Sequence, residues 1–156
     1  MPETGIVAEP GKQEIVVTRV LDAPRERVFG LYTDPKRMPL WWGPRSLKAT
    51  EVHADMRAGG AWRLVLRDSG GKEYTFRGTY HLVVPPELVV YTFEFDGLPG
   101  RVIFWSVRFA ERGGKSVVTD RVVFRSAEDR DALLGQGMKE SLDETWQRFA
   151  ELLNRA

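Results

Sequence analysis

The chain has 156 residues, a length that suits one domain burying roughly 70% of the surface of its unfolded form. A formal net charge of +1 gives no long-range field to attract nucleic acid or an anionic membrane, and the apolar runs are far shorter than the ~20 residues of a membrane span. The absence of cysteine excludes disulfides and thiolate chemistry, and the first residues lack the pattern of a signal peptide, so we expect a cytoplasmic protein.

The start of the chain is predicted to precede the folded domain. Residues 1–13 are rich in Pro, Gly and Glu, which is typical of a flexible segment. The stretch EIVVTRVLDA begins at Glu14 and alternates as a strand does. We therefore expect a flexible segment over residues 1–13 and a single domain over residues 14–156.

Two short helices are predicted after the first strand. Asp22 is placed as an N-cap, Pro24 suits the first turn of a helix, and apolar residues follow at helical spacing. Pro35 and Pro39 then leave room only for a short second helix before the two adjacent tryptophans.

Six further segments alternate with the period of two that is typical of strands, and turns such as DSGGK and VPPE separate them. The alternation predicts inward-facing side chains at Trp62, Leu64, Leu66, Tyr74, Phe76, Tyr80, Leu82, Tyr91, Phe93, Ile103, Trp105, Val107 and Phe109. On the last of these strands Asp120 shares the inward face with Val118 and Val122. One acid is therefore expected inside the protein.

The C-terminal region predicts a long amphipathic helix that begins near Ser126, a good N-cap, despite Gly135 and Gly137. Its apolar stripe consists of Leu134, Met138, Ser141, Leu142, Thr145, Trp146, Phe149 and Leu153. A one-sided sheet needs such a helix to cover its apolar face. The sequence thus predicts an α+β fold in which an antiparallel sheet of six to seven strands packs on one long helix.

Four motifs in order resemble the START-like superfamily, and within it the family named for the activator of the heat-shock protein 90 ATPase. They are DAPRERVFGLYTDPKRMPLWWGP, DMRAGGAWRL, GTYHLVVPPELVVYTFEF and GQGMKESLDETWQRFAELL, and the resemblance covers roughly residues 14–153. It implies a helix-grip fold, in which a curved sheet wraps the C-terminal helix and the space between them often holds an apolar small molecule. Many relatives carry an aromatic residue, typically tryptophan, after the glycine equivalent to Gly137, whereas this chain has Met138.

The inward aromatic side chains either fill the core or form the walls of a ligand cavity. We predict a mostly apolar cavity, whose candidate ligand-binding residues are Trp41, Trp42, Trp62, Tyr91, Phe93, Trp105, Asp120, Met138, Leu142 and Trp146. The two adjacent tryptophans stand between Pro39 and Pro44. They are expected either to form a lid that contacts ligand or to plug the open end of the core.

The chain offers few residues for catalysis. His53 and His81 are far apart, no glycine-rich phosphate loop precedes a helix and no nucleophile elbow is present, so we expect no metal, no cofactor and no catalytic residue. Asp55 and Arg57 are expected to pair structurally across a turn. A buried Asp120 must find a partner, such as an arginine, or acquire a raised pKa. The strand with Glu51 and His53 is too mixed to show which face is inward, so both stay candidates for the cavity.

The sequence is compatible with three functions. The first is non-enzymatic binding of an apolar, aromatic or lipid-like small molecule between sheet and helix. The second is a protein-interaction module resembling the heat-shock ATPase activator, with a chaperone as partner. The third is an enzyme resembling polyketide cyclases and aromatases. We favour the first, with a small-molecule partner, no nucleic acid and no membrane, and a homodimer is left open.

Overall fold

The computed structural model of the chain describes residues 5–155. Its elements, in chain order, are β1 (Gly5–Val7), β2 (Glu14–Leu21), α1 (Arg25–Tyr32), α2 (Met38–Trp41), β3 (Lys48–Ala54), β4 (Ala61–Arg67), β5 (Glu73–Val84), β6 (Leu88–Phe95), β7 (Ile103–Arg112), β8 (Lys115–Val123), α3 (Ala127–Leu134) and α4 (Met138–Arg155). The first four residues of the predicted flexible segment lie outside the described residues.

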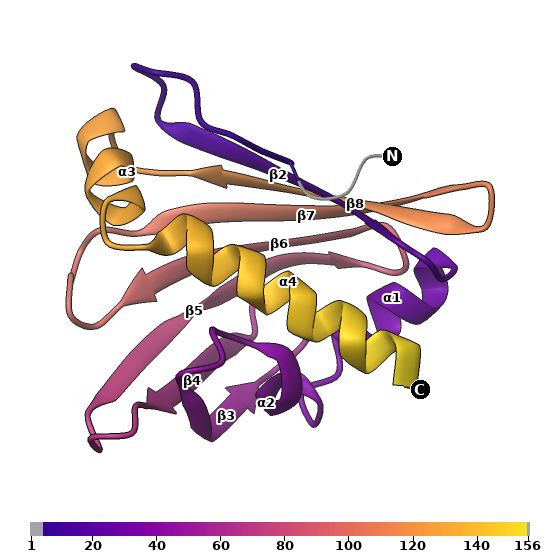
Figure 1. The fold of residues 1–156 in the computed structure, drawn as a ribbon, viewed down its shortest axis with the longest axis horizontal. Helices are drawn as coiled ribbons and strands as arrows, with labels where there is room; N and C mark the ends of the chain where they lie inside the picture. The colour runs from indigo at the N-terminus through magenta and orange to yellow at the C-terminus, as the bar shows by residue number, and fades with distance from the viewer. Residues whose placement is uncertain (1–4, 156) are drawn as a thin grey trace.

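All strands belong to one antiparallel sheet in the order β1-β2-β8-β7-β6-β5-β4-β3. Within residues 5–155 the sheet has eight strands rather than the six or seven predicted, because residues 5–7 form an edge strand on β2 with Ile6 opposite Val17. Regular structure therefore begins at Gly5 and not at Glu14. The sheet curves around α4, which crosses its concave face, so the predicted helix-grip architecture is confirmed (Figure 1).

The side chains of the predicted inward rows are buried or partly buried with one exception. Trp62, Leu64 and Leu66 of β4 are buried, as is the row of β7 that contains Trp105. Leu82 of β5 was predicted to face inward, but its side chain is 48% exposed. The pairing of β5 with β6 shifts register between Tyr80 and Leu82, and such a bulge moves the next side chains to the opposite face.

The helices differ from the prediction at two points. The cap of α1 is Pro24 and not Asp22, and in the first turn the Arg25 amide donates to the Glu111 side chain at 3.1 Å. The C-terminal helix is divided in two, because Gly137 takes a left-handed φ of 91° between α3 and α4. The predicted cap at Ser126 is confirmed: its hydroxyl accepts a hydrogen bond from the Asp129 amide at 3.0 Å.

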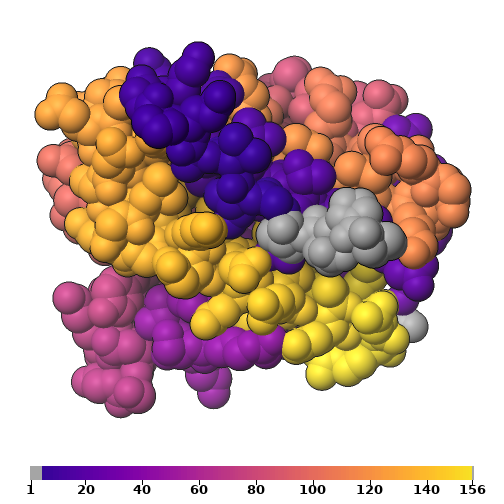
Figure 2. All heavy atoms as spheres, turned by 45° about the horizontal axis from the view of Figure 1, so that its top comes forward, coloured from indigo at the N-terminus to yellow at the C-terminus, as the bar shows by residue number. Residues whose placement is uncertain are grey.

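The apolar side of α4 packs into the sheet while its opposite side forms part of the molecular surface. Trp146, Phe149 and Leu153 are almost fully buried. In the space-filling view the segment that includes α2, coloured purple, lies against the yellow α4 (Figure 2). Within residues 5–155, no helix is long and apolar enough to cross a membrane.

Candidate functional site

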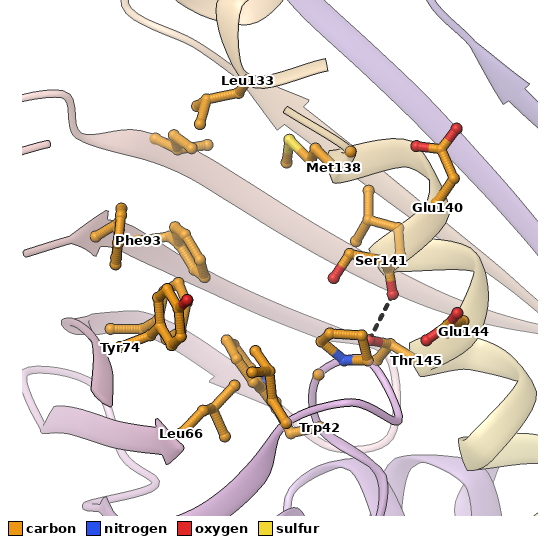
Figure 3. Close-up of a pocket in the computed structure, with 18 of the residues that line it drawn as sticks. Trp42, Leu66, Tyr74, Phe93, Leu133, Met138, Glu140, Ser141, Glu144 and Thr145 are labelled. Atoms are coloured by element: carbon orange, nitrogen blue, oxygen red, sulfur yellow. Dashed lines mark hydrogen bonds between the residues drawn. The ribbon is translucent and has the colours of Figure 1, made fainter. Parts of the chain in front are cut away.

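A cavity of about 470 Å³ lies between the concave face of the sheet and α4. Tyr74 and Phe93 approach it from the sheet, and Met138, Ser141 and Thr145 approach it from α4 on the other side (Figure 3). The walls are mostly apolar and aromatic. The cavity exists because α4 covers the concave face of the sheet without its side chains filling all of the space between them.

The deep end of the cavity contains a buried carboxyl group. Asp120 is 2% exposed, and its Oδ2 accepts a hydrogen bond from Trp105 Nε1 at 3.0 Å. Burial raises the pKa of Asp120 to about 7, although the Trp105 hydrogen bond, the positive charge of Arg19 and the Trp146 side chain act to lower it. Arg19 pairs with Asp143 at 2.5 Å instead of forming a salt bridge with Asp120. The predicted inward acid is thus confirmed, but without an arginine partner.

Two tyrosine hydroxyls lie at the same end. Tyr32 of α1 and Tyr91 of β6 share a hydrogen bond of 3.0 Å between their hydroxyl oxygens. Burial raises the pKa of both phenols well above the usual range, and the charge of Asp120 raises them further. Both hydroxyls therefore stay protonated at neutral pH.

One wall of the cavity is a cluster of aromatic rings. Trp42 lies 5.2 Å from Phe76 and 6.0 Å from Phe93, measured between ring centroids. Trp62 packs behind them, 5.7 Å from Phe93, and its Nε1 donates to the Thr92 carbonyl at 3.1 Å. Ring pairs at such separations favour a rigid wall.

The two adjacent tryptophans differ in burial and in their position relative to the cavity. Trp41, the last residue of α2, is 3% exposed and packs 5.2 Å from both Tyr32 and Phe149, measured between ring centroids. Trp42 is only partly buried and forms a cavity wall. Trp41 therefore has the packing of a plug, although an edge of it also reaches the cavity.

The loop after α2 is attached to α4 by charged side chains. The Arg148 guanidinium donates to the carbonyls of Leu40 at 3.0 Å and Gly43 at 2.8 Å. Arg45 pairs with Glu151, and the Arg45 amide donates to Glu144 at 3.0 Å. Gly43 has a left-handed φ of 89°, which a residue with a side chain rarely adopts. These contacts hold Trp42 over the cavity.

The cavity lining reaches exposed residues where α3 meets α4, and we call this part the mouth. Gln136, Met138 and Glu140 line it from this junction, and Arg101 lines it from the β6–β7 loop. The glycine pair that divides the C-terminal helix thus also shapes the opening. The mouth is polar and charged, in contrast to the apolar walls further inside.

Most of the residues predicted from sequence to bind ligand come together around this one cavity. Its lining includes Trp41, Trp42, Tyr91, Phe93, Trp105, Asp120, Met138, Leu142 and Trp146. Trp62 is the exception: it lies behind the wall and borders a much smaller cavity of about 20 Å³. Its inward direction was predicted correctly, but Trp42 and Phe93 cover it.

Three other sequence-based expectations can be compared with the structure. Asp55 and Arg57 pair at 2.9 Å across the turn after β3, as predicted. Glu51 and His53 are exposed and do not face the cavity, because a register shift between Ala49 and Glu51 turns them outward. Across residues 5–155, no group of His, Asp and Glu side chains is arranged to hold a metal ion.

Two residues of the site, Tyr32 and Arg148, were not predicted from the sequence. Tyr32 lies in the first predicted helix among the residues at helical spacing, and its hydroxyl gave no separate signal. Arg148 lies on α4, where a charged residue beside an apolar stripe is ordinarily a solvated one. Only the three-dimensional contact of α4 with the loop after α2 reveals its role.

Comparison with known proteins identifies the family. No curated protein sequence matches the chain. A crystal structure of a Rhodobacter sphaeroides protein has a TM-score of 0.87 at 22% identity, covering 97% of this chain and 98% of that chain. A Mycobacterium smegmatis protein has a TM-score of 0.86 at 24% identity, covering 97% of each chain. These similarities show the fold. The model of the family described as Activator of Hsp90 ATPase homolog 1-like protein matches residues 22–154, so the chain belongs to this family, as its motifs predicted.

Proposed function

We propose that the protein binds an apolar small molecule in the cavity between the sheet and α4. The observation that carries this proposal is the cavity itself, whose volume of about 470 Å³ lies within the range typical of ligand sites. Its walls consist mainly of aromatic and aliphatic side chains from the sheet, α4 and the loop after α2. A few polar groups stand at its two ends, which is the usual composition of a small-molecule site.

The energetics of packing support the same proposal. Side chains around a large cavity lose the dispersion contacts that a close-packed core would provide, and this loss lowers stability. A ligand of matching shape restores those contacts and stabilises the folded protein. The aromatic wall of Trp42, Phe76 and Phe93 is suited to flat rings, because offset and edge-to-face ring pairs are favourable.

Titration with the fluorescent probe N-phenyl-1-naphthylamine tests the proposal. We expect saturable binding of one probe per chain, and a probe concentration of 100 times Kd should raise Tm by about 8 °C. Leu142→Trp places a large ring in the cavity and should weaken binding at least tenfold. Leu82→Trp is the matched control, because Leu82 is 48% exposed on the outer face of the sheet.

The outcome also separates this function from that of an interaction module. The family description names activation of an Hsp90 ATPase, an activity that would use the protein surface. If the wild type shows no saturable binding, or if both tryptophan variants bind like the wild type, the cavity is not a binding site. Equal ATPase stimulation by wild type and Leu142→Trp, together with such a result, would support the interaction module.

A further inference from the structure

The deep end of the cavity has an acceptor atom without a partner. Asp120 Oδ1 is buried and has no hydrogen-bond partner of regular geometry among the described residues, although the Trp146 side chain lies near the carboxyl group, whereas Oδ2 is bound by Trp105. Buried polar atoms are nearly always satisfied, since an unpaired one keeps the full cost of losing water. Asp120 belongs to the lining of the cavity, so a molecule inside it lies near this carboxyl group, and contact with Oδ1 needs a small shift of the side chains that cover it.

A hydrogen-bond donor lies in the same part of the cavity. The hydroxyls of Tyr32 and Tyr91 share one hydrogen bond, which uses one of their two protons. The second proton remains available for donation. Both side chains line the cavity, and both are near enough to Asp120 for its charge to act on them. The deep end therefore presents one acceptor and one donor within aromatic walls.

We infer that the ligand of this cavity is an aromatic molecule with a hydroxyl group, and that the hydroxyl donates its proton to Asp120 Oδ1 at the deep end. This inference rests on the proposed function and specifies its ligand class. A hydroxyl can donate to the carboxyl group and accept from a tyrosine at the same time. The aromatic body then lies along the wall that contains Trp42 and Phe93.

Two other polar groups fit the deep end less well. A ligand carboxylate would meet the carboxyl group of Asp120, which disfavours a second negative charge. An ammonium group could donate to Asp120 but could not accept the tyrosine proton, and the positive charge of Arg19 acts on the same region. The hydroxyl is the group that matches both the acceptor and the donor.

The test compares three naphthalene probes by calorimetric titration at about pH 8, where the carboxyl group is mostly ionised. Of these, 2-naphthol can donate a hydrogen bond, 2-acetylnaphthalene can only accept one, and 2-methylnaphthalene can do neither. The measured quantity is the ratio of Kd values between probes in each protein. Each ratio is compared between wild type and variant. Differences in how water solvates the probes cancel in this comparison, because they are the same for both proteins.

Two variants of Asp120 give distinct expected results. Asp120→Leu keeps the size of the side chain and should reduce the preference for 2-naphthol over 2-methylnaphthalene about tenfold, as expected for loss of a hydrogen bond to a charged group. Asp120→Asn keeps its carbonyl oxygen on the Trp105 donor and turns its amide NH₂ toward the cavity. It should therefore shift the preference toward 2-acetylnaphthalene. Glu51→Gln removes a carboxylate that is exposed and does not face the cavity, and it should leave all ratios unchanged.

The failure of this inference is distinguishable from the failure of the proposed function. If all three probes bind the wild type and neither Asp120 variant changes the ratios, the cavity binds ligands but Asp120 does not select a hydroxyl. If Glu51→Gln changes the ratios as much as Asp120→Leu, general charge and not the deep-end contact is responsible, and the inference is again wrong. If no probe binds the wild type, the proposed function itself fails.

Discussion

Replacing Asp120 by asparagine should remove a large pH dependence of stability. The folded-state pKa of Asp120 is about 7 because of burial, against an ordinary value of 3.8. The folded protein thus holds a proton that the unfolded chain releases, so this group lowers stability progressively as pH rises from about 4 to 7. A difference of about 3.2 pKa units corresponds to about 4 kcal/mol, at 1.36 kcal/mol per unit.

Urea unfolding of wild type and Asp120→Asn at pH 4 and pH 8 measures this effect. The free energy of unfolding of the wild type minus that of the variant should fall by about 4 kcal/mol between the two pH values. Other titrating groups cancel in this difference, including Arg19 on β2, Tyr32 on α1 and Tyr91 on β6, which all face Asp120. A difference that stays constant within about 1 kcal/mol would refute the reasoning.

Asp68→Asn provides a control of opposite sign. Backbone hydrogen bonds from Lys72 and Gly70, together with the Tyr74 hydroxyl, hold the pKa of Asp68 below its usual value. A group with a lowered folded-state pKa stabilises the folded protein at pH values above its unfolded-state pKa. This stabilisation is lost as pH falls through the folded-state pKa. The wild type should therefore gain stability relative to Asp68→Asn as pH rises, whereas it loses stability relative to Asp120→Asn.

Four further substitutions test how the site and its sheet are built. Trp41→Ala should lower the free energy of unfolding in urea by about 3 to 5 kcal/mol, while the folded fraction keeps its probe affinity. Trp42→Ala should mainly weaken probe binding, because the Trp42 ring forms a cavity wall. Equal affinity losses in both would contradict this division. Arg148→Met should lower the free energy of unfolding by about 2 kcal/mol and speed probe release in stopped-flow fluorescence, since the loop carbonyls lose their donor. An unchanged release rate would show that the loop is held by other contacts. Gly78→Ala should lower Tm, because a Cβ at this position would stand 1.8 Å from a backbone oxygen of the neighbouring strand. The control is Gly30→Ala on an open helix surface, which should raise the free energy of unfolding by about 0.5 to 1 kcal/mol.

The sequence predicts the faces of regular strands well and fails where register shifts. Alternation correctly placed Trp62, Trp105 and Asp120 inward because β4, β7 and β8 keep a period of two through these positions. The same rule misplaced Leu82, which follows a bulge. A bulge is a property of the pairing between two strands, so the residues of one strand alone do not reveal it.

Which inward side chains line the cavity could not be predicted from the sequence. Alternation shows that a side chain faces the interior but not how close it lies to the cavity, since Trp62 points inward and still lies behind Trp42. The edge strand at residues 5–7 was missed because three residues are too few for periodicity to show. Likewise, Gly135 and Gly137 indicated weakness in the helix, but only the left-handed φ at Gly137 shows that the helix ends there.

The charged contacts of α4 decide where a ligand can enter. Arg148 and Arg45 fasten the loop after α2 to α4 from two sides, so this loop is a restrained wall and a poor gate. At the other end, the α3–α4 junction presents Met138, a flexible side chain, beside the left-handed Gly137. We therefore expect a ligand to enter at this junction. A hydroxyl that leads the aromatic body would then cross the apolar middle and reach Asp120 at the deep end, which is the orientation that the two polar ends of the cavity favour.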